Sequence, residues 1–487
     1  MNKFLCFLMC FLCVTAFAQT DSTKAGKVWT LKECVDYALS NNLDVQRGQL
    51  NVETGEINYL QAKMAMAPTL NASVSNGYNW GRSINPVTNQ FTTQQITSLS
   101  PGANSSVTLF NGFRIQNTIK QNGKDYQASE LDLEKAKNDV TLNVINLYIN
   151  VIFNKELLEN AKFQLSSSQQ QLERTKKQVA AGALPKSNEL NLDAQVATNE
   201  VNVINNENAL NLSLLQLKQA LQLPASESMD VEVPALSIED LVIDQSREQI
   251  YDIARQSMPE IKSADLKLQS SYYAVKAAKG NLYPRLSLNG SINSNYSSAN
   301  DRARLIPDGG VERDANPMPI AFFDPTGTQI PVSAYGYSPT GTMSDGYGYR
   351  DQLQDNIFRS ASVALTIPLF NGLQAKSNVR RSEISQRLAE ITQKQVNNTL
   401  RQNVETAYND AFAASKTYNS SQRQVQAREE AFRMTQQRYD IGAANYVEYQ
   451  VAENDLFQAK SDLSRAKYNF IFRKKLLDFY QGKPLGF

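Results

Sequence analysis

The tetrapeptide Leu109-Phe110-Asn111-Gly112 recurs 260 positions later as Leu369-Phe370-Asn371-Gly372. Nearer the start of each half, Pro68 is matched by Pro284 at a spacing of 216. Regular self-similarity of this kind is typical of a duplicated structural unit. We therefore predict two repeats, of which the second gains 44 residues between Pro284 and its tetrapeptide.

Two strand-like segments lead up to each tetrapeptide. In all four, apolar side chains alternate with small polar ones, which predicts strands with two unlike faces. The predicted strands are residues 69–80, 103–110, 285–296 and 358–369. The apolar face includes Leu70, Val74, Trp80, Leu288, Ile292, Val363, Leu365 and Ile367.

Alternation is also typical of a soluble sheet with one buried face, so alone it does not indicate a membrane. Three features favour contact with lipid. The segments have about ten residues, the length of a tilted membrane strand. Tyr78, Trp80 and Tyr296 stand at strand ends, where an interfacial aromatic girdle would lie. The opposite faces are small and hydrophilic, which suits a water-filled lumen.

A long helix is predicted after each tetrapeptide. No proline interrupts residues 112–181 or 372–441, so each helix of about 70 residues would be ~105 Å long. Both end at a glycine, Gly182 or Gly442, the residue favoured just past a helix C-terminus. A break is expected at Pro259 in the helix of residues 246–281.

Helix starts are indicated by capping residues. Ser246 with Gln249 predicts a capping box, and Asn445 with Glu448 predicts a cap and its reciprocal partner. Ser187 is the predicted N-cap of the first return helix.

The predicted organisation has a leader, two repeats, a link and a short tail. The leader is a signal peptide, residues 1–18. The first repeat, 19–223, contains a helix at 31–66, strands at 69–80 and 103–110, a long helix at 112–181 and a return helix at 187–221. Residues 224–245 connect the repeats at mid-height. The second repeat, 246–481, contains a helix at 246–281, strands at 285–296 and 358–369, a long helix at 372–441 and a return helix at 445–480. Residues 482–487 form the C-terminal tail.

The N-terminus has the pattern of an exported protein. A basic start at Lys3 and an apolar run precede a small-residue cleavage site after Ala18. A membrane anchor is the alternative, but this run falls short of the ~20 apolar residues that span a bilayer. Lipidation at Cys13 is a weaker alternative, because Leu12 stands where a small residue is wanted.

Composition excludes several classes of function. Of four cysteines, only Cys34 lies beyond the predicted leader, so no internal disulfide is expected. The chain has no histidine, the commonest acid-base group and metal ligand. Without Lys3, basic and acidic residues balance at 48 each, so no nucleic-acid partner is expected. We expect no catalysis and no cofactor, since no phosphate-binding loop, metal cluster or nucleophile–histidine pair is present.

Four strands cannot close a barrel, and an open sheet edge is not tolerated in lipid. Several copies must therefore complete a ring. Two copies would give eight strands around a filled interior, and three would give twelve strands around a channel.

These features resemble the TolC-like outer-membrane efflux family. The resemblance covers the whole mature chain and rests on four stretches in order: residues 29–42 at the start of the first helix, Ala67-Pro68-Thr69-Leu70, Tyr283-Pro284-Arg285-Leu286, and Leu221-Gln222-Leu223-Pro224. It implies an α+β membrane protein that, as a homotrimer, forms a 12-strand β-barrel in outer-membrane lipid and a 12-helix periplasmic tunnel. It further implies docking to a periplasmic adaptor (membrane fusion) protein and an inner-membrane transporter, for efflux or type I secretion.

The resemblance also implies a periplasmic entrance at the two helical turns. The entrance or gate would include Tyr439, Ser187 and Glu448, which are similar to family positions. It would also include Asn188, which stands where the family often has Asp, and Glu453, which lies near a second acidic position but out of register with it. Adaptor contacts are expected at the turn tips, from Gly182, Gly442, Arg174, Lys177 and Arg438, although ordinary solvated helix faces would explain the three basic residues equally well. Three Glu448 carboxylates would form a cation-selective ring, although Glu448 could equally serve only as a helix-capping partner of Asn445.

Two other functions compete with a passive exit duct. A coiled-coil adhesin or scaffold of the envelope would explain the long helices but not the matched strand pairs. A hydrolase that uses two carboxylates would need an acid pair in a cleft, which nothing in the sequence indicates. The sequence does not identify the cargo.

Overall fold

A computed structural model describes residues 27–84, 89–93, 95–233, 245–298, 304–314, 318–323, 330–344 and 347–483. The predicted signal peptide, half of the predicted link (residues 234–244) and the end of the tail lie outside the described residues. The chain divides into two compact units that each draw on both repeats. A helical unit comprises Met1–Glu56, Lys124–Gln269 and Arg387–Phe487, and a sheet unit comprises Ile57–Gly123 and Ser270–Gln386.

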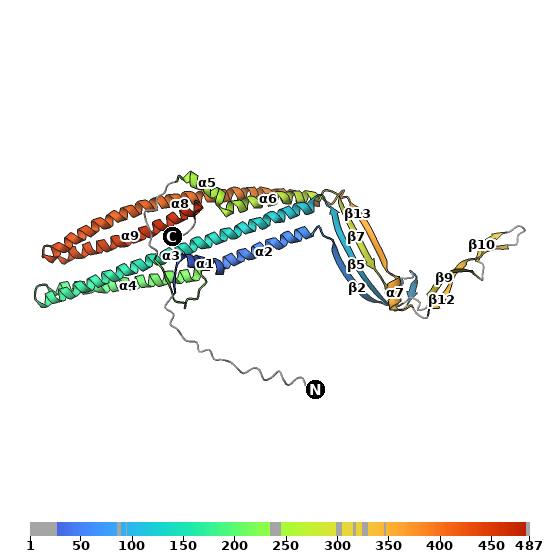
Figure 1. Ribbon diagram of the computed structural model, residues 1–487, viewed down its shortest axis with the longest axis horizontal. Coiled ribbons are helices and arrows are strands. Elements are labelled where there is room, and N and C mark those ends of the chain that lie inside the picture. The colour runs from blue at the N-terminus through green and yellow to red at the C-terminus, as the bar shows by residue number, and fades with distance from the viewer. Residues whose placement is uncertain are drawn as a thin grey trace, which may run out of the picture. The chain divides into compact units, whose positions relative to one another are not determined.

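The helices repeat at the spacings read from the sequence. The long helices are α3 (Arg114–Ala180) and α8 (Gln374–Asp440), and the return helices are α4 (Lys186–Ala220) and α9 (Tyr446–Tyr480). These pairs start 260 residues apart. In each hairpin, the return helix runs beside the far part of its long helix (Figure 1).

The remaining long segment of each repeat is two helices rather than one. Residues 31–66 form α1 (Leu31–Asn41) and α2 (Leu43–Met64), and residues 246–281 form α5 (Arg247–Ser257) and α6 (Pro259–Gly280). The residues at the two breaks, Asn42 and Met258, have the same extended backbone. The break predicted at Pro259 is present, and Ser246 and Gln249 form the predicted capping box.

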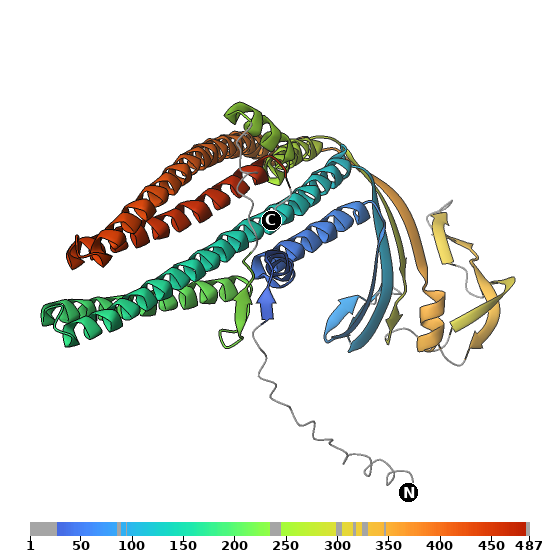
Figure 2. The ribbon, with the colours of Figure 1, turned by 60° about the vertical axis from the view of Figure 1, so that its left-hand side comes forward.

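The main sheet consists of antiparallel strands in the order β13-β7-β5-β2, seen edge to edge in Figure 2. Their bounds are β2 Thr69–Asn79, β5 Ile96–Phe110, β7 Arg285–Asn293 and β13 Phe358–Thr366. The first repeat supplies β2 and β5, the second supplies β7 and β13, and the repeats meet where β5 pairs with β7.

Strand β5 starts at Ile96, seven residues before the predicted start at Ala103. Pro101 and Gly102 within it read as turn residues. Tertiary pairing overrides that local signal, because Pro101 stands opposite Val74 of β2 and its carbonyl oxygen accepts a hydrogen bond from Ser294 N (3.0 Å). Trp80 and Ile367 lie just beyond the strands to which they were assigned.

Several short strands were not predicted. In the helical unit, β1 (Lys27–Trp29) pairs in parallel with β6 (Met229–Val231). In the sheet unit, β3 (Arg82–Ile84) pairs with β4 (Phe91–Thr93), and β8 (Tyr296–Ser297) extends the main sheet. Within the inserted segment of the second repeat, β9 (Arg304–Arg313) pairs with β12 (Tyr337–Ser344), β10 (Met318–Phe323) pairs with β11 (Ile330–Ala334), and α7 spans Tyr349–Asp355.

The hydrophobic core belongs to the helical unit, which contains the four buried apolar clusters found among the described residues. The largest joins α1, α3, α4 and α9 to the β1–β6 pair. At its centre Tyr148 donates from Oη to Glu232 O (2.7 Å) and Trp29 O (3.0 Å). These two contacts connect Trp29, at the start of the first repeat, and Glu232, in the link after that repeat, to the middle of α3. No helix in the described part of the chain has the length and apolar character needed to cross a bilayer.

Candidate functional site

The turn between α8 and α9 is built by local backbone bonds. Gly442 has a left-handed φ of 74°, and Ala443 N donates to Arg438 O (2.7 Å) five residues back. This is the Schellman arrangement, in which glycine accepts the left-handed conformation at no steric cost. The helix end predicted at Gly442 is therefore set by the residue itself.

Glu448 lies at this turn with its carboxylate held by its own chain. Its backbone N donates to Asn445 Oδ1 (2.9 Å), as predicted for the cap, while Asn445 Nδ2 donates to Glu448 Oε1 (3.0 Å). The reciprocal bond thus comes from the asparagine side chain rather than its backbone. Arg438, expected at an adaptor contact, forms a 3.4 Å ion pair with Glu448. The Arg438 guanidinium therefore offsets part of the Glu448 charge.

The turn between α3 and α4 repeats this architecture at Gly182, whose φ is 76°. Ala183 N donates to Gln178 O (2.8 Å). Ser187 is not the N-cap as predicted, because α4 starts at Lys186 and its N-cap is Pro185, which has no side-chain hydrogen bond. Proline already fixes the extended backbone that a cap requires, so a hydroxyl is not needed to start the helix.

Exposed polar side chains surround the first turn. Ser187 is exposed and Asn188 is half-buried. Arg174 and Lys177 are exposed on the last turns of α3. These two basic residues form no ion pair within the described part of the chain, whereas the neighbouring Lys176 pairs with Glu173 (3.1 Å).

Behind the turns, an aromatic cluster joins the two hairpins. The ring of Tyr439 on α8 lies 5.0 Å from that of Tyr449 on α9. Gln171 Nε2 on α3 lies 3.5 Å from Tyr439 Oη, at the limit of a hydrogen bond. The cluster comprises Leu172, Leu192, Val196, Tyr446 and Tyr449, with Leu165, Phe432 and Tyr439 packed against it. Tyr439, assigned to the gate from sequence, is therefore part of the contact between hairpins.

Glu453 lies next to this cluster and faces inward. Its side chain is 7% exposed, and its Oε1 accepts a hydrogen bond from Ser167 Oγ on α3 (2.9 Å). Burial raises the pKa of this carboxyl, and the bond from Ser167 lowers it by less. Within one chain, the hydrogen bond of Glu453 therefore connects α9 to α3. Its surroundings favour the protonated, uncharged carboxyl, which does not point into solvent.

The partners of these residues could not be recognised from the sequence. Ser167 and Gln171 stand in a polar stretch of α3 that carries no motif. A signal for Glu453 was available, because Tyr446, Tyr449 and Leu456 share its helical face at spacings of three and four and are buried. That spacing predicts a buried carboxyl rather than a lumen-facing one.

The apolar face of the main sheet is uncovered in the single chain. Leu70, Val74, Val363 and Leu365 are each at least 60% exposed. Leu288, Ile292, Trp80 and Ile367 are also exposed. An exposed apolar patch of this kind marks an interaction surface. Among the described residues, no three His, Cys, Asp or Glu side chains gather as metal ligands would.

Comparison with known proteins agrees with this geometry. A family model described as "Outer membrane efflux protein" matches residues 34–222 and 250–472. "Toxin and drug export protein A" of Aggregatibacter actinomycetemcomitans is 19% identical over 453 residues, which are 93% of this chain and 86% of that protein. "Nodulation protein T" of Rhizobium leguminosarum bv. viciae is 21% identical, over 90% of this chain and 78% of that protein. The crystal structure of the outer membrane protein VceC of Vibrio cholerae has the same fold, with a TM-score of 0.71 over 94% of this chain and 97% of that one at 15% identity.

Proposed function

The chain belongs to the outer membrane efflux protein family, and we propose that three copies of it form one passive exit duct for an efflux or type I secretion system. Members of this family are channel proteins of the outer membrane. The trimer, the closed barrel, the tunnel and the partners are the parts that we propose for this chain.

One observation carries the proposal: among the described residues, the main sheet has an uncovered apolar face and two unpaired edges, β2 and β13. Exposed edges and apolar faces are unfavourable in water. In a closed ring within a bilayer, the apolar face meets hydrocarbon and each edge finds a partner. The opposite faces, with Ser73, Ser75 and Ser362, would then line a wet lumen.

The internal repeat indicates how the edges would pair. β5 corresponds to β13, and β7 corresponds to β2, so the β5–β7 junction inside the chain is a template for β13 against β2 of the next copy. In the template Asn104 pairs with Ser291. Adding the spacing of 260 to Asn104 gives Ala364, and subtracting the spacing of 216 from Ser291 gives Ser75. The repeat therefore predicts that Ala364 pairs with Ser75 of a neighbouring copy. This register keeps Leu365 and Val74 together on the apolar face.

The copy number follows from the width of the lumen. Two copies would give eight strands, whose interior is filled by side chains, whereas three give twelve strands and leave a channel. Each chain contributes two long helices and two columns of half-length helices, so three chains would build a tunnel wall of twelve columns.

Energy for transport would come from an inner-membrane transporter, acting through a periplasmic adaptor protein. We expect the adaptor at the two hairpin turns, because Arg174 and Lys177 leave exposed cationic groups beside Gly182. Nearby, three copies of Glu448 would narrow the entrance as an acidic ring, with Arg438 moderating its charge.

Disulfide trapping tests the ring. The variant with Ala364→Cys and Ser75→Cys should form disulfide-linked dimers and trimers under mild oxidation, with nothing larger. The matched control, Ala364→Cys with Ser73→Cys, is two residues out of register, so its Cα atoms would lie ~7–8 Å apart, which is too far for a disulfide. A ladder that extends past the trimer would refute the copy number, and equal trapping of both variants would refute the register.

A further inference from the structure

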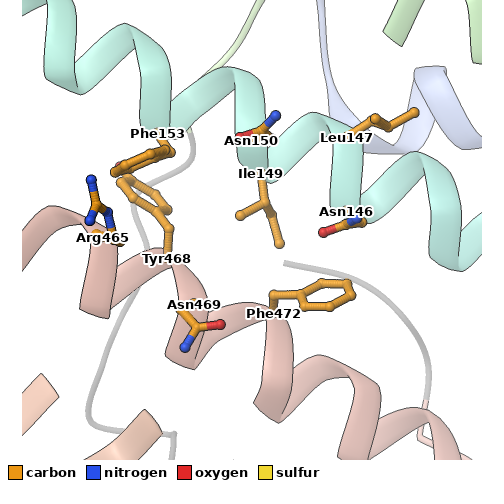
Figure 3. A pocket seen from close by; sticks show the side chains of 9 residues that line it. All are labelled: Asn146, Leu147, Ile149, Asn150, Phe153, Arg465, Tyr468, Asn469 and Phe472. Atoms are coloured by element: carbon orange, nitrogen blue, oxygen red, sulfur yellow. The ribbon is translucent and has the colours of Figure 1, made fainter. Parts of the chain in front are cut away.

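A pocket of about 330 Å³ opens between α3 and α9 near the middle of the helical unit. In Figure 3, Ile149 extends from α3 toward α9, the ring of Phe153 lies over that of Tyr468, and Asn146 and Asn150 lie along α3 across from Asn469 and Phe472. Arg465 closes one end beside the ring of Tyr468. The volume falls within the range of sites for small molecules.

Four polar side chains that line this pocket have no partner among the described residues. Within the described part of the chain, Asn146, Asn150, Asn469 and Arg465 form no hydrogen bond or ion pair. By contrast, Tyr468 is committed, because its Oη donates to Glu156 Oε2 (2.6 Å). Three carboxamides and one guanidinium are therefore available to a ligand.

The pocket has an aromatic wall and a single charge. The rings of Phe153 and Tyr468 meet at 6.4 Å in an edge-to-face arrangement, and Phe472 lies at the other end. Arg465 is the one charged residue among those that line it. Glu156, the carboxylate bonded to Tyr468, does not line the pocket and is held by Ser464, Tyr468 and Lys467. A ligand therefore meets aromatic carbon and a net positive charge.

The repeat shows that ordinary helix packing does not require these residues. The positions 260 residues away from the α3 residues are Thr406, Asp410 and Ala413, and those matching Arg465, Asn469 and Phe472 are Asn205, Ala209 and Leu212. None of the three carboxamides, nor Arg465 or either phenylalanine, is retained at its matched position. The pocket thus belongs to one junction of each chain.

The pocket also opens on a defined face of α3. Tyr148 and Lys155, which bond Trp29 of β1 and Asp230 of β6, lie on one side of the helix. Asn146, Asn150 and Phe153 lie about 140–200° around the helix from Tyr148, on the opposite side. The β1–β6 pair covers the Tyr148 side of α3 and would obstruct a lumen on that side. In a ring of copies with an open lumen, that side of α3 would therefore face outward and the pocket would face the lumen.

We propose that this pocket binds small molecules in which a flat aromatic body carries a carboxylate or a similar anion. The Arg465 guanidinium would bind the anion, the carboxamides would bond polar substituents, and the ring would stack against Phe153 and Phe472. Its role as a cargo contact in the lumen rests on the proposed function, whereas the binding itself does not.

The probe is 2-naphthoate, measured by isothermal titration against the purified full-length protein in detergent. Naphthalene-2-methylamine, a cation of the same shape, and cyclohexanecarboxylate, an anion without an aromatic ring, are the matched probes. Binding of naphthoate should exceed binding of both. Arg465→Gln and Phe472→Leu should each weaken it about tenfold, the effect of one lost charge-assisted or ring contact. Leu212→Ala, at the position that matches Phe472, should leave the affinity unchanged.

Equal binding by the parent protein and the Arg465→Gln variant would overturn the proposal, as would absence of naphthoate binding. Single-channel recording on the same preparations separates this failure from failure of the proposed function. A conducting pore without naphthoate binding removes only the pocket. Naphthoate binding that requires Arg465, in a protein that never conducts, upholds the pocket and removes the duct. In a conducting pore, naphthoate should reduce the current, and Arg465→Gln should relieve that reduction.

Discussion

Replacing three left-handed glycines by alanine separates packing inside the chain from packing between copies. Gly112, Gly372 and Gly442 have φ values of 63°, 60° and 74°. A Cβ at Gly112 would lie 2.6 Å from Gly280 O and 2.7 Å from Tyr283 Cβ, whereas at Gly372 and Gly442 it meets no described atom within 4 Å. The three sites share one backbone conformation and differ in their neighbours.

The expected magnitudes follow from these contacts. A left-handed alanine costs about 1–2 kcal/mol, and forcing a methyl group against backbone atoms costs about 1–3 kcal/mol more. The free energy of unfolding should therefore fall by about 2–5 kcal/mol in Gly112→Ala and by about 1–2 kcal/mol in Gly442→Ala. Denaturant titration in detergent, followed by helical ellipticity, measures both.

Gly372→Ala is the informative variant. In an isolated chain it should behave like Gly442→Ala. In a ring built on the repeat, the turn that ends α2 in a neighbouring copy, residues 64–67, would stand where Gly280 and Tyr283 stand beside Gly112. The oligomer of Gly372→Ala should then dissociate on heating at a lower temperature than the oligomer of Gly442→Ala. Semi-native electrophoresis measures both dissociation temperatures. Equal dissociation temperatures, together with a destabilised Gly112→Ala, would refute the repeat-based junction.

Four further predictions concern single residues. Because burial raises the pKa of Glu453, folding favours the protonated acid, and the free energy of unfolding should fall as pH rises from about 4.3. Glu453→Gln should remove this pH dependence. An unchanged pH dependence between pH 4 and 8 in the variant would contradict the assignment. Glu448→Gln should reduce cation preference and block by multivalent cations in single-channel recordings, and unchanged values would leave this residue only its capping role. Tyr148→Phe should lower the free energy of unfolding by about 1–3 kcal/mol, since Glu232 O loses its buried donor; a change below ~0.5 kcal/mol would mean that water replaces the hydroxyl. Pro259→Ala should leave the break between α5 and α6 in place, because the matching break at Asn42 forms without proline, and a continuous helix in a crystal structure of the variant would show that proline causes it.

Local chemistry explains why the helices could be predicted closely. Gly182 and Gly442 end their helices through a conformation that depends on one residue, and Ser246 caps α5 through a partner three residues away. Because of the duplication, each element of one repeat could also be compared with its counterpart in the other repeat. These signals depend only on residues close in the sequence, so they can be recognised without knowing which distant segments are in contact.

Less of the candidate site could be predicted. Glu448 was placed correctly at its turn as the partner of Asn445, because that contact is local. Its ion pair with Arg438 spans the turn and was not expected. Glu453 was assigned to the entrance, yet it bonds Ser167, which lies 286 residues away in the chain. The periodicity around Glu453 indicates burial but not which helix buries it.

The sequence alone determined the duplication, the helices and the two-faced strands of this protein, since each follows from short-range spacing or from the conformational preference of a single residue. Only the tertiary structure decided which elements meet: β1 with β6, Pro101 within a central strand, and the pocket residues of α3 with those of α9. Contacts between distant segments depend on how buried surfaces fit together. A single sequence records the residues that fit but not the pairing.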